Sequence, residues 1–251
     1  MMKVPTLIHV FAILIALAMP AFPADRILIA DGFESYSTGK QPYRPADGNS
    51  HSWRFEGLDS VSVVEGKSPD GGKPNAKLLQ VTGTNASSFG REFDRQNGEL
   101  SQLNLKLTFK ILPERFEGDD YTIQLRDQSQ ASHNPVNIRI ASNGAVTVFN
   151  GDGEPGGSAK QYPLVPKSNP LAAGNWYEFL VDIDLTGQQY SVSVTDPATG
   201  STRSTPDLYF LRNVKTVDEL RFSSNSVGSN TGIDWKIDDI NLSVVSKSEK
   251  Q

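Results

Sequence analysis

The sequence contains no cysteine among its 251 residues, so cysteine-zinc sites, disulfide bonds and thiol catalysis are excluded. Its three methionines all lie within the first 19 residues. Positive charge is also scarce, because 24 Lys and Arg residues face 29 Asp and Glu residues, which gives a net charge of −5. Without a surplus of basic side chains to neutralise phosphates, the composition argues against binding to nucleic acid.

Long hydrophobic runs are absent except at the N-terminus. There Lys3 precedes an apolar run from Leu7 to Met19 that only His9 interrupts, and Ala24 follows shortly after. This pattern predicts a secretory signal peptide over residues 1–24, although Phe22 occupies a position where a cleavage site favours a small residue. An uncleaved anchor is the alternative, but the run is short for a membrane span. Removal of residues 1–24 leaves 227 residues with a net charge of −6. The signal peptide predicts a bacterial protein that is secreted or periplasmic and is not inserted in the membrane.

The rest of the chain shows short runs of alternating apolar and polar residues, separated by Gly, Pro, Asn, Asp and Ser. The clearest run is Leu103 to Ile111, and Asn143-Gly144 is a typical hairpin turn. About a dozen such strands without a helical period predict an all-β fold of two antiparallel sheets. We expect one domain over residues 25–245 and a polar tail over 246–251. The predicted core includes Leu105, Leu107, Phe109, Ile123, Leu125, Ile138, Phe179, Val181, Val192 and Ile240.

Three short motifs occur in a fixed order. Asp31 to Pro42 reads D-x-F-E-x-Y-x-x-G-x-x-P and is followed by Trp53, Gly174 to Asp182 reads G-x-W-Y before an Asp, and Asp238 to Ile240 reads D-D-I. In this order they resemble bacterial secreted domains of the concanavalin A-like lectin/glucanase group, which includes laminin-G-like modules. The resemblance covers essentially the whole chain after the signal segment, and implies a jelly-roll sandwich. Because the group contains lectins, glycoside hydrolases and polysaccharide lyases, it does not fix an activity.

A row of polar residues lies on the face opposite the predicted core. If the three strands that carry them pair, their amide, guanidinium and hydroxyl groups converge where they can bind sugar hydroxyls or a uronic carboxylate. The solvated outer face of any sandwich gives the same pattern, so this alternative stays open. Exposed aromatic rings would support a sugar site, and Trp53, Tyr43 and Tyr162 are candidates, although each can equally cap the core. The predicted ligand-binding residues are Lys106, Gln124, Arg126, Asn137, Arg139 and Trp53, with Thr108 in the same row.

Catalytic motifs are lacking. Glu178, Asp182 and Asp184 share one face of a predicted strand, which gives a possible carboxylate pair, but Asp184 is better explained as a turn residue before Gly187. His133 lies near Tyr121, Gln124, Arg126 and Arg139 in the sequence, as a lyase site would need, yet no lyase motif is present. We therefore assign no catalytic residue.

The resemblance also implies a structural calcium ion. The resembled glycanases hold calcium with a carboxylate of the last strand and carbonyl groups near the start of the domain. Asp239 matches the last-strand position, and Asp31 and Glu34 stand near the start. Carboxylates and carbonyls are the ligands that calcium prefers. The alternative is that Asp239 only accepts backbone hydrogen bonds or pairs with an arginine.

These observations favour a secreted carbohydrate-binding protein, lectin-like and without catalysis, whose partner is a polysaccharide or oligosaccharide. A polysaccharide lyase or glycoside hydrolase is the first alternative. A structural or adhesion module that docks on another secreted protein is the second, and should show an exposed apolar patch.

Overall fold

The computed structural model describes residues 26–42, 52–56, 60–72, 76–83, 87–97, 104–116, 120–130, 134–151, 159–211, 214, 216–224 and 233–245. The predicted signal segment and polar tail lie outside these residues, as do Tyr43, His51 and His133. Within the described residues, no helix has the length and apolar character needed to cross a membrane.

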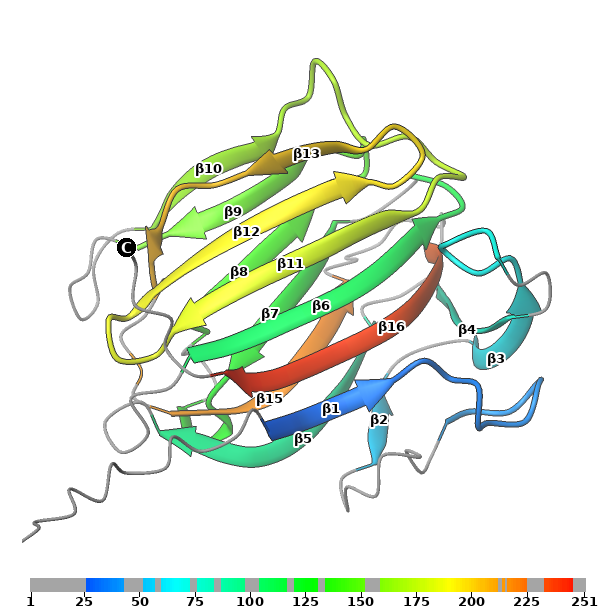
Figure 1. Ribbon diagram of the computed structural model, residues 1–251, viewed down its shortest axis with the longest axis horizontal. Helices are drawn as coiled ribbons and strands as arrows, with labels where there is room; N and C mark the ends of the chain where they lie inside the picture. The colour runs from blue at the N-terminus through cyan, green and yellow to red at the C-terminus, as the bar shows by residue number, and fades with distance from the viewer. Residues whose placement is uncertain are drawn as a thin grey trace, which may run out of the picture.

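The described chain forms two antiparallel sheets that lie face to face (Figure 1). Sheet A, nearer the viewer in Figure 1, contains nine strands: β1 (Arg26–Asp31), β3 (Ser60–Gly66), β4 (Ala76–Gly83), β6 (Asn104–Pro113), β11 (Tyr177–Asp184), β12 (Gln189–Asp196), β13 (Ser201–Ser204), β14 (Leu208–Tyr209) and β16 (Ile233–Val245). Sheet B, behind it, contains seven: β2 (Trp53–Glu56), β5 (Ser87–Asn97), β7 (Tyr121–Arg126), β8 (Val136–Ile140), β9 (Val146–Asn150), β10 (Lys160–Val165) and β15 (Thr216–Ser224).

Strand order confirms the predicted two-sheet jelly roll. Sheet A runs β13-β12-β11-β6-β16-β4-β3, and sheet B runs β10-β9-β8-β7-β15-β5-β2. The described helical content is one short 3₁₀ turn, η1 (Gln128–Gln130). The first and last strands lie side by side, because β16 pairs with β6 along one edge and with both β4 and β1 along the other.

Every second side chain of a strand points into the space between the two sheets, as the alternation in the sequence predicts. All ten predicted core residues are buried. Phe109 of β6 stacks on its sheet A neighbour Phe179 of β11 at 4.9 Å between ring centroids. The Phe109 ring also meets Phe222 of β15 edge to face at 5.5 Å, which joins the two sheets. A register shift of one residue would bury the polar row instead, so this core fixes which side chains face outward.

The Asn143-Gly144 turn joins β8 to β9, as expected. Gly144 has φ of 79°, and a Cβ atom there would lie 2.4 Å from the carbonyl oxygen of Leu171. Only glycine can adopt this left-handed backbone conformation and also leave room for the loop at residue 171. The turn therefore fixes the loop that leads into β11 as well as the hairpin.

Candidate functional site

Outward-facing residues of sheet B form a polar surface across five strands, which we call the sheet B face. Strand register builds one row across it: Arg54 lies opposite Gly90, Gly90 opposite Arg221, Arg221 opposite Gln124, and Gln124 opposite Asn137. Residues on β7 and β8 that the sequence predicted to converge thus do so, with β15 and β5 extending the row. This surface is the best candidate for a binding site.

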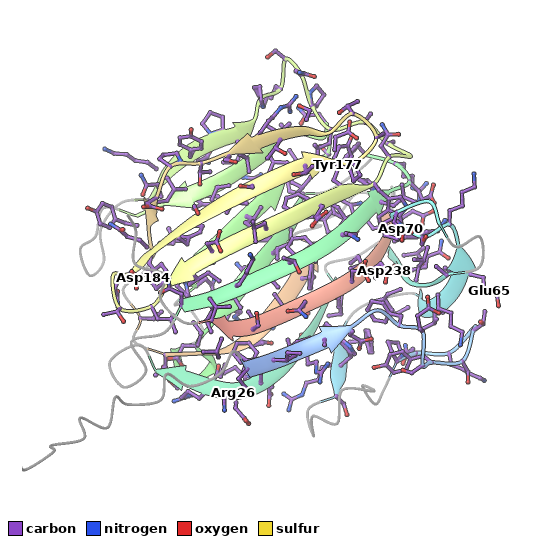
Figure 2. The ribbon with its side chains drawn as sticks, viewed as in Figure 1. Arg26, Glu65, Asp70, Tyr177, Asp184 and Asp238 are labelled. Carbon is purple, nitrogen blue, oxygen red and sulfur yellow. The ribbon has the colours of Figure 1, made fainter. Side chains whose placement is uncertain are left out.

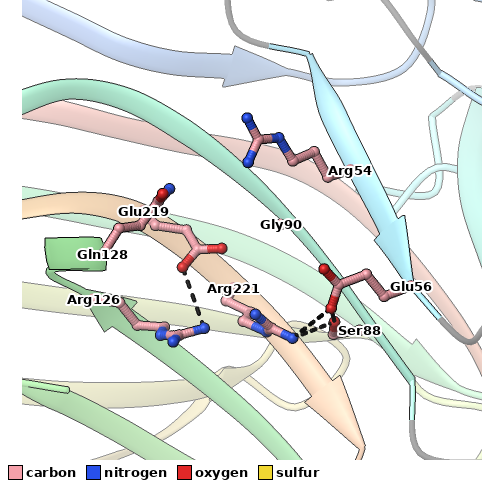
Figure 3. A pocket seen from close by; sticks show the side chains of 8 residues that line it. All are labelled: Arg54, Glu56, Ser88, Gly90, Arg126, Gln128, Glu219 and Arg221. Carbon is pink, nitrogen blue, oxygen red and sulfur yellow. Dashed lines mark hydrogen bonds and ion pairs between the residues drawn. The ribbon is translucent and has the colours of Figure 1, made fainter. Parts of the chain in front are cut away.

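The sheet B face is hollowed where β5 carries glycine. A depression of about 240 Å³ opens there (Figure 3), lined by Arg54, Glu56, Ser88, Gly90, Arg126, Gln128, Glu219 and Arg221. A Cβ atom at Gly90 would lie 2.9 Å from the backbone oxygen of Leu220 and 3.3 Å from Oε1 of Glu219. The missing side chain therefore leaves the floor of the arginine hollow, as we call this depression, at the level of the backbone.

Each arginine of the hollow is matched by a glutamate. Arg126 Nη1 lies 3.3 Å from Glu219 Oε2, and Arg221 Nη2 donates to Glu56 Oε2 at 2.9 Å and to Ser88 Oγ at 2.7 Å (Figure 3).

Arg54 pairs with Glu92 at the rim of the arginine hollow. Donors and acceptors thus alternate across a charge-balanced surface, which suits a ligand whose groups both donate and accept hydrogen bonds.

Glu219 is the titratable group of the hollow with a perturbed environment. Burial raises its pKa above the usual value, and the charges of Arg126 and Arg221 oppose that rise without cancelling it. A half-buried carboxyl group of this kind in a depression is typical of functional sites, although ion-pair networks give the same signature.

Two carboxylates hold the η1 turn that places Gln128 at the rim of the hollow. Its backbone N–H donates to Asp218 Oδ1 at 2.8 Å, and Asp127 accepts bonds from the Ser129 backbone and hydroxyl and from the Thr216 hydroxyl. Burial of Asp127 opposes its ionisation, but these bonds outweigh burial and hold its pKa below the usual value. The η1 turn is therefore fixed where it borders the hollow.

The structure divides the predicted polar row between two sheets. Lys106 and Thr108 lie on β6 in sheet A, so the expectation that they join the residues of β7 and β8 is wrong. The physical reason is that β6 and β7 belong to different layers, although alternation assigns both an outward face. In sheet B, Arg139 lies beyond the hollow and pairs with Asp120.

Trp53 is 2% exposed, which corrects the expectation of an exposed ring at this position. Its Nε1–H donates to Asp31 Oδ2 at 2.8 Å, Tyr36 donates its hydroxyl to the same oxygen at 2.8 Å, and the Phe33 N–H donates to Oδ1 at 3.0 Å. Arg91, fully buried, lies 3.9 Å from Asp31 and 5.9 Å from the Trp53 ring centre. The D-x-F-E-x-Y motif and its tryptophan therefore form one buried cluster that fixes the start of the domain. Tyr162 likewise packs against the core.

Asp31 does not fit the predicted calcium site, because donors within the protein already surround both of its carboxylate oxygens. Asp238 and Asp239 fit better. β16 bulges at these residues, Asp239 has φ of 50°, and a Cβ atom at Gly32 would lie 3.4 Å from Asp239 Oδ1 and 3.8 Å from Asp238 Oδ1. The bulge brings both carboxylates toward Gly32, which successive residues of a regular strand would not allow.

The charge around this bulge is mixed. Burial raises the pKa of Asp238 to about 7, and the neighbouring Asp239 and Glu34 add to the rise. Asp239 is exposed and accepts a 2.8 Å bond from Lys110. Among the described residues, no three His, Cys, Asp or Glu side chains come close enough together to hold a metal ion. A cation here would need backbone carbonyl groups in addition to the two aspartates.

The proposed catalytic groups do not assemble in the described structure. Glu178, Asp182 and Asp184 share the outer face of sheet A, as alternation predicts, but Asp184 accepts the Gly187 N–H at 2.8 Å and holds the β11–β12 turn. Tyr121 faces the core, where it stacks on Trp235 at 3.6 Å. It is therefore on the opposite side of β7 from Gln124 and Arg126.

Sequence reasoning missed much of the hollow. Glu219 and Arg221 lie on β15, where alternation with the buried Leu220 and Phe222 turns them outward. No local sequence pattern marks Ser88, Gly90 or Glu56 as part of a site. They reach the hollow only because β5 pairs with β15 and with β2.

No family model and no curated protein matches the sequence. Solved structures do share its fold. The binding domain of botulinum neurotoxin serotype D has a TM-score of 0.55 at 13% identity, covering 89% of this chain and 49% of that chain. Lectin I from Ulex europaeus, in complex with the methyl glycoside of α-L-fucose, has a TM-score of 0.53 at 9% identity, covering 89% of this chain and 99% of that one.

Lectin UEA-II complexed with galactose has a TM-score of 0.52 at 10% identity, covering 83% of this chain and all of the lectin. The chain spans about half the length of the neurotoxin domain it matches. At these identities the likeness shows the fold alone, a two-sheet lectin jelly roll.

Proposed function

We propose that the protein binds carbohydrate at the sheet B face, with the arginine hollow as the centre of the site. The observation that carries this proposal is the pairing of guanidinium and carboxylate groups around a floor of bare backbone at Gly90. A sugar hydroxyl can accept from an arginine and donate to a glutamate, so vicinal hydroxyls match both members of such a pair. Gln124 and Asn137 extend the same row and add amide groups.

The fold supports this proposal, since lectins with the same architecture were solved with galactose and with a fucoside. The expected N-terminal signal segment is consistent with this proposal, because a protein exported to the periplasm or out of the cell would meet polysaccharides and oligosaccharides there.

Affinity electrophoresis against a polysaccharide panel tests the proposal. Arg221→Ala removes the side chain that bridges Glu56 and Ser88, while Arg203→Ala on sheet A makes the same charge change away from the hollow. Loss of charged hydrogen bonds worth about 1.5–3 kcal/mol predicts roughly 10- to 100-fold weaker retention for Arg221→Ala only. Equal retention of both variants and wild type would reject the sheet B face as the site.

Glycan cleavage at the same face is the second candidate, and the raised pKa of Glu219 favours it. A carboxyl group that stays protonated to higher pH than usual suits a general acid. Glu56 and Glu92 offer further carboxylates nearby, as glycan hydrolysis needs. New reducing ends or unsaturated uronate after incubation with the panel, lost in Glu219→Gln, would establish an enzyme. Retention without either product supports binding alone.

A docking module has less support. Ile27 and Tyr209 are the exposed large hydrophobic residues of the described chain, and β16, β6, β11 and β12 separate their strands. They do not form the continuous apolar patch that protein docking favours.

A structural calcium ion at the β16 bulge belongs to the proposal as well. Asp238 and Asp239 supply two converging carboxylates, and a bound cation would lower the raised pKa of Asp238. The ion would then link the last strand to Gly32 at the start of the domain.

A further inference from the structure

The outer face of sheet A carries a second polar surface, centred on an exposed aromatic ring. Tyr209 of β14 is 45% exposed, while its neighbour Leu208 is buried. The backbone of Tyr209 is fixed, because its N–H donates to Asn150 Oδ1 at 2.9 Å and its carbonyl accepts from Gly151 at 3.1 Å. The ring is therefore held at the surface by a rigid strand.

Strand register extends this surface across sheet A. Tyr209 lies opposite Gln189, Gln189 opposite Asp184, and Asp184 opposite Asn104. With strands about 4.8 Å apart, the row from Tyr209 to Asn104 measures roughly 14 Å. Figure 2 labels Asp184 at one end of β11 and Tyr177 at the other, so the row lies at the Asp184 end of the sheet.

A second row lies two residues further along the strands. Ser191 is opposite Asp182, and Asp182 is opposite Lys106, the residue that the sequence had assigned to a binding surface. Both Asp182 and Lys106 are exposed. We call Tyr209, Gln189, Asn104, Asp182 and Lys106 the tyrosine face.

Within the described residues, the charged side chains of the tyrosine face differ from those of the arginine hollow in having no partners. Asp182 and Lys106 are directly opposed on their strands, yet neither side chain forms an ion pair or a hydrogen bond to the described part of the chain. Opposite charges at such positions ordinarily pair, so these two exposed groups remain available to a ligand.

We propose that the tyrosine face is a second glycan-binding surface, which takes a neutral oligosaccharide segment. The negative face of the tyrosine ring attracts the C–H groups on one side of a pyranose ring. Asp182 accepts hydroxyl hydrogen bonds, Lys106 donates, and the amide group of Gln189 does both. The charges of Asp182 and Lys106 balance, which favours an uncharged ligand.

The two surfaces lie on opposite outer faces of the sandwich, so a glycan segment seated on one cannot occupy the other. A protein with both surfaces occupied therefore links two glycan segments. This bridging is the functional consequence of the proposal, and it goes beyond binding at the arginine hollow.

The experiment uses the full chain with a soluble mixed-linkage β-glucan, galactomannan and starch as neutral probes, and alginate as the acidic comparison. Retention in affinity gels reports binding, and light scattering reports linkage of polysaccharide chains. Tyr209→Ala removes the ring from an exposed position, Tyr209→Phe keeps it, and Arg221→Ala alters the other face. We expect Tyr209→Ala to weaken retention on a neutral probe about tenfold and to abolish scattering, with Tyr209→Phe close to wild type.

The outcomes separate the two proposals. If Tyr209→Ala matches wild type in retention and scattering while Arg221→Ala fails, the tyrosine face is refuted and the arginine hollow stands. If Tyr209→Ala loses retention while Arg221→Ala keeps it, the hollow fails and the tyrosine face stands. Retention on alginate alone, or on no probe, overturns the tyrosine face.

Discussion

Replacing Tyr36 with phenylalanine tests the buried cluster that the N-terminal motif builds. The Tyr36 hydroxyl donates to Asp31 Oδ2 at 2.8 Å, and Asp31 is 6% exposed. Tyr36→Phe deletes this hydroxyl and keeps the ring, which packs on Phe33 at 6.1 Å between centroids. The variant therefore removes one hydrogen bond to a buried carboxylate and creates almost no cavity.

The expected loss follows from the charge of the acceptor. Hydrogen bonds to charged groups contribute about 1.5–3 kcal/mol, more than neutral pairs, because the buried carboxylate is left short of a donor. Asp31 keeps the donors of Phe33 and Trp53 and the nearby charge of Arg91, so the fold should persist. For a domain of this size each kcal/mol lowers Tm by about 2–4 °C, which predicts a decrease of roughly 3–12 °C.

Thermal melts followed by circular dichroism, with urea titrations for the free energy of unfolding, measure this decrease. Tyr209→Phe is the matched control, since it deletes the hydroxyl of an exposed tyrosine and should leave Tm unchanged. Polysaccharide retention of Tyr36→Phe should equal that of wild type below its melting range. A Tm equal to that of the control would refute the assignment of the motif to fold stability.

Three further changes test other parts of the structure. Asp127→Asn should cost roughly 1.5–3 kcal/mol near neutral pH. Because the folded-state pKa of Asp127 is depressed, this contribution is present above its unfolded pKa and is lost as pH falls through the folded value, so urea melts of variant and wild type should converge in acid. Leu107→Ala should cost about 2–5 kcal/mol and Lys106→Ala less than about 0.5, and the reverse order in urea melts would contradict the register of β6. If calcium occupies the β16 bulge, EDTA should lower the Tm of wild type but not of Asp239→Asn, and a wild-type melt indifferent to EDTA rejects the ion.

The buried cluster also changes the meaning of the motif that suggested the fold. Tyr36 and Trp53 both donate to Asp31, and Arg91 lies beside Asp31 and Trp53, in the core where a soluble ligand cannot reach them. Residues that carry a family resemblance can therefore report how the start of the domain is held in the core rather than what the protein binds.

Local patterns in the sequence are enough to specify the fold class and the direction of most side chains. Alternation along β6 separates Leu105, Leu107 and Phe109 from Lys106, and this separation is local, because successive residues of a strand point to opposite faces. The hairpin at Gly144 was equally readable, since its backbone conformation depends on adjacent residues. Each of these features needs information from only a few neighbouring positions.

Which outward side chains meet depends instead on how the strands pair in three dimensions. β6 and β7 follow one another along the chain but lie in different sheets, whereas β7, β15 and β5 are distant in sequence and adjacent in space. Gly90 and Arg221 therefore share a hollow that no local pattern could indicate, and Lys106 faces Asp182 on the other side of the molecule. Periodicity specifies a face for each strand, but the pairing of strands depends on long-range packing of the whole core, and that pairing creates both candidate surfaces.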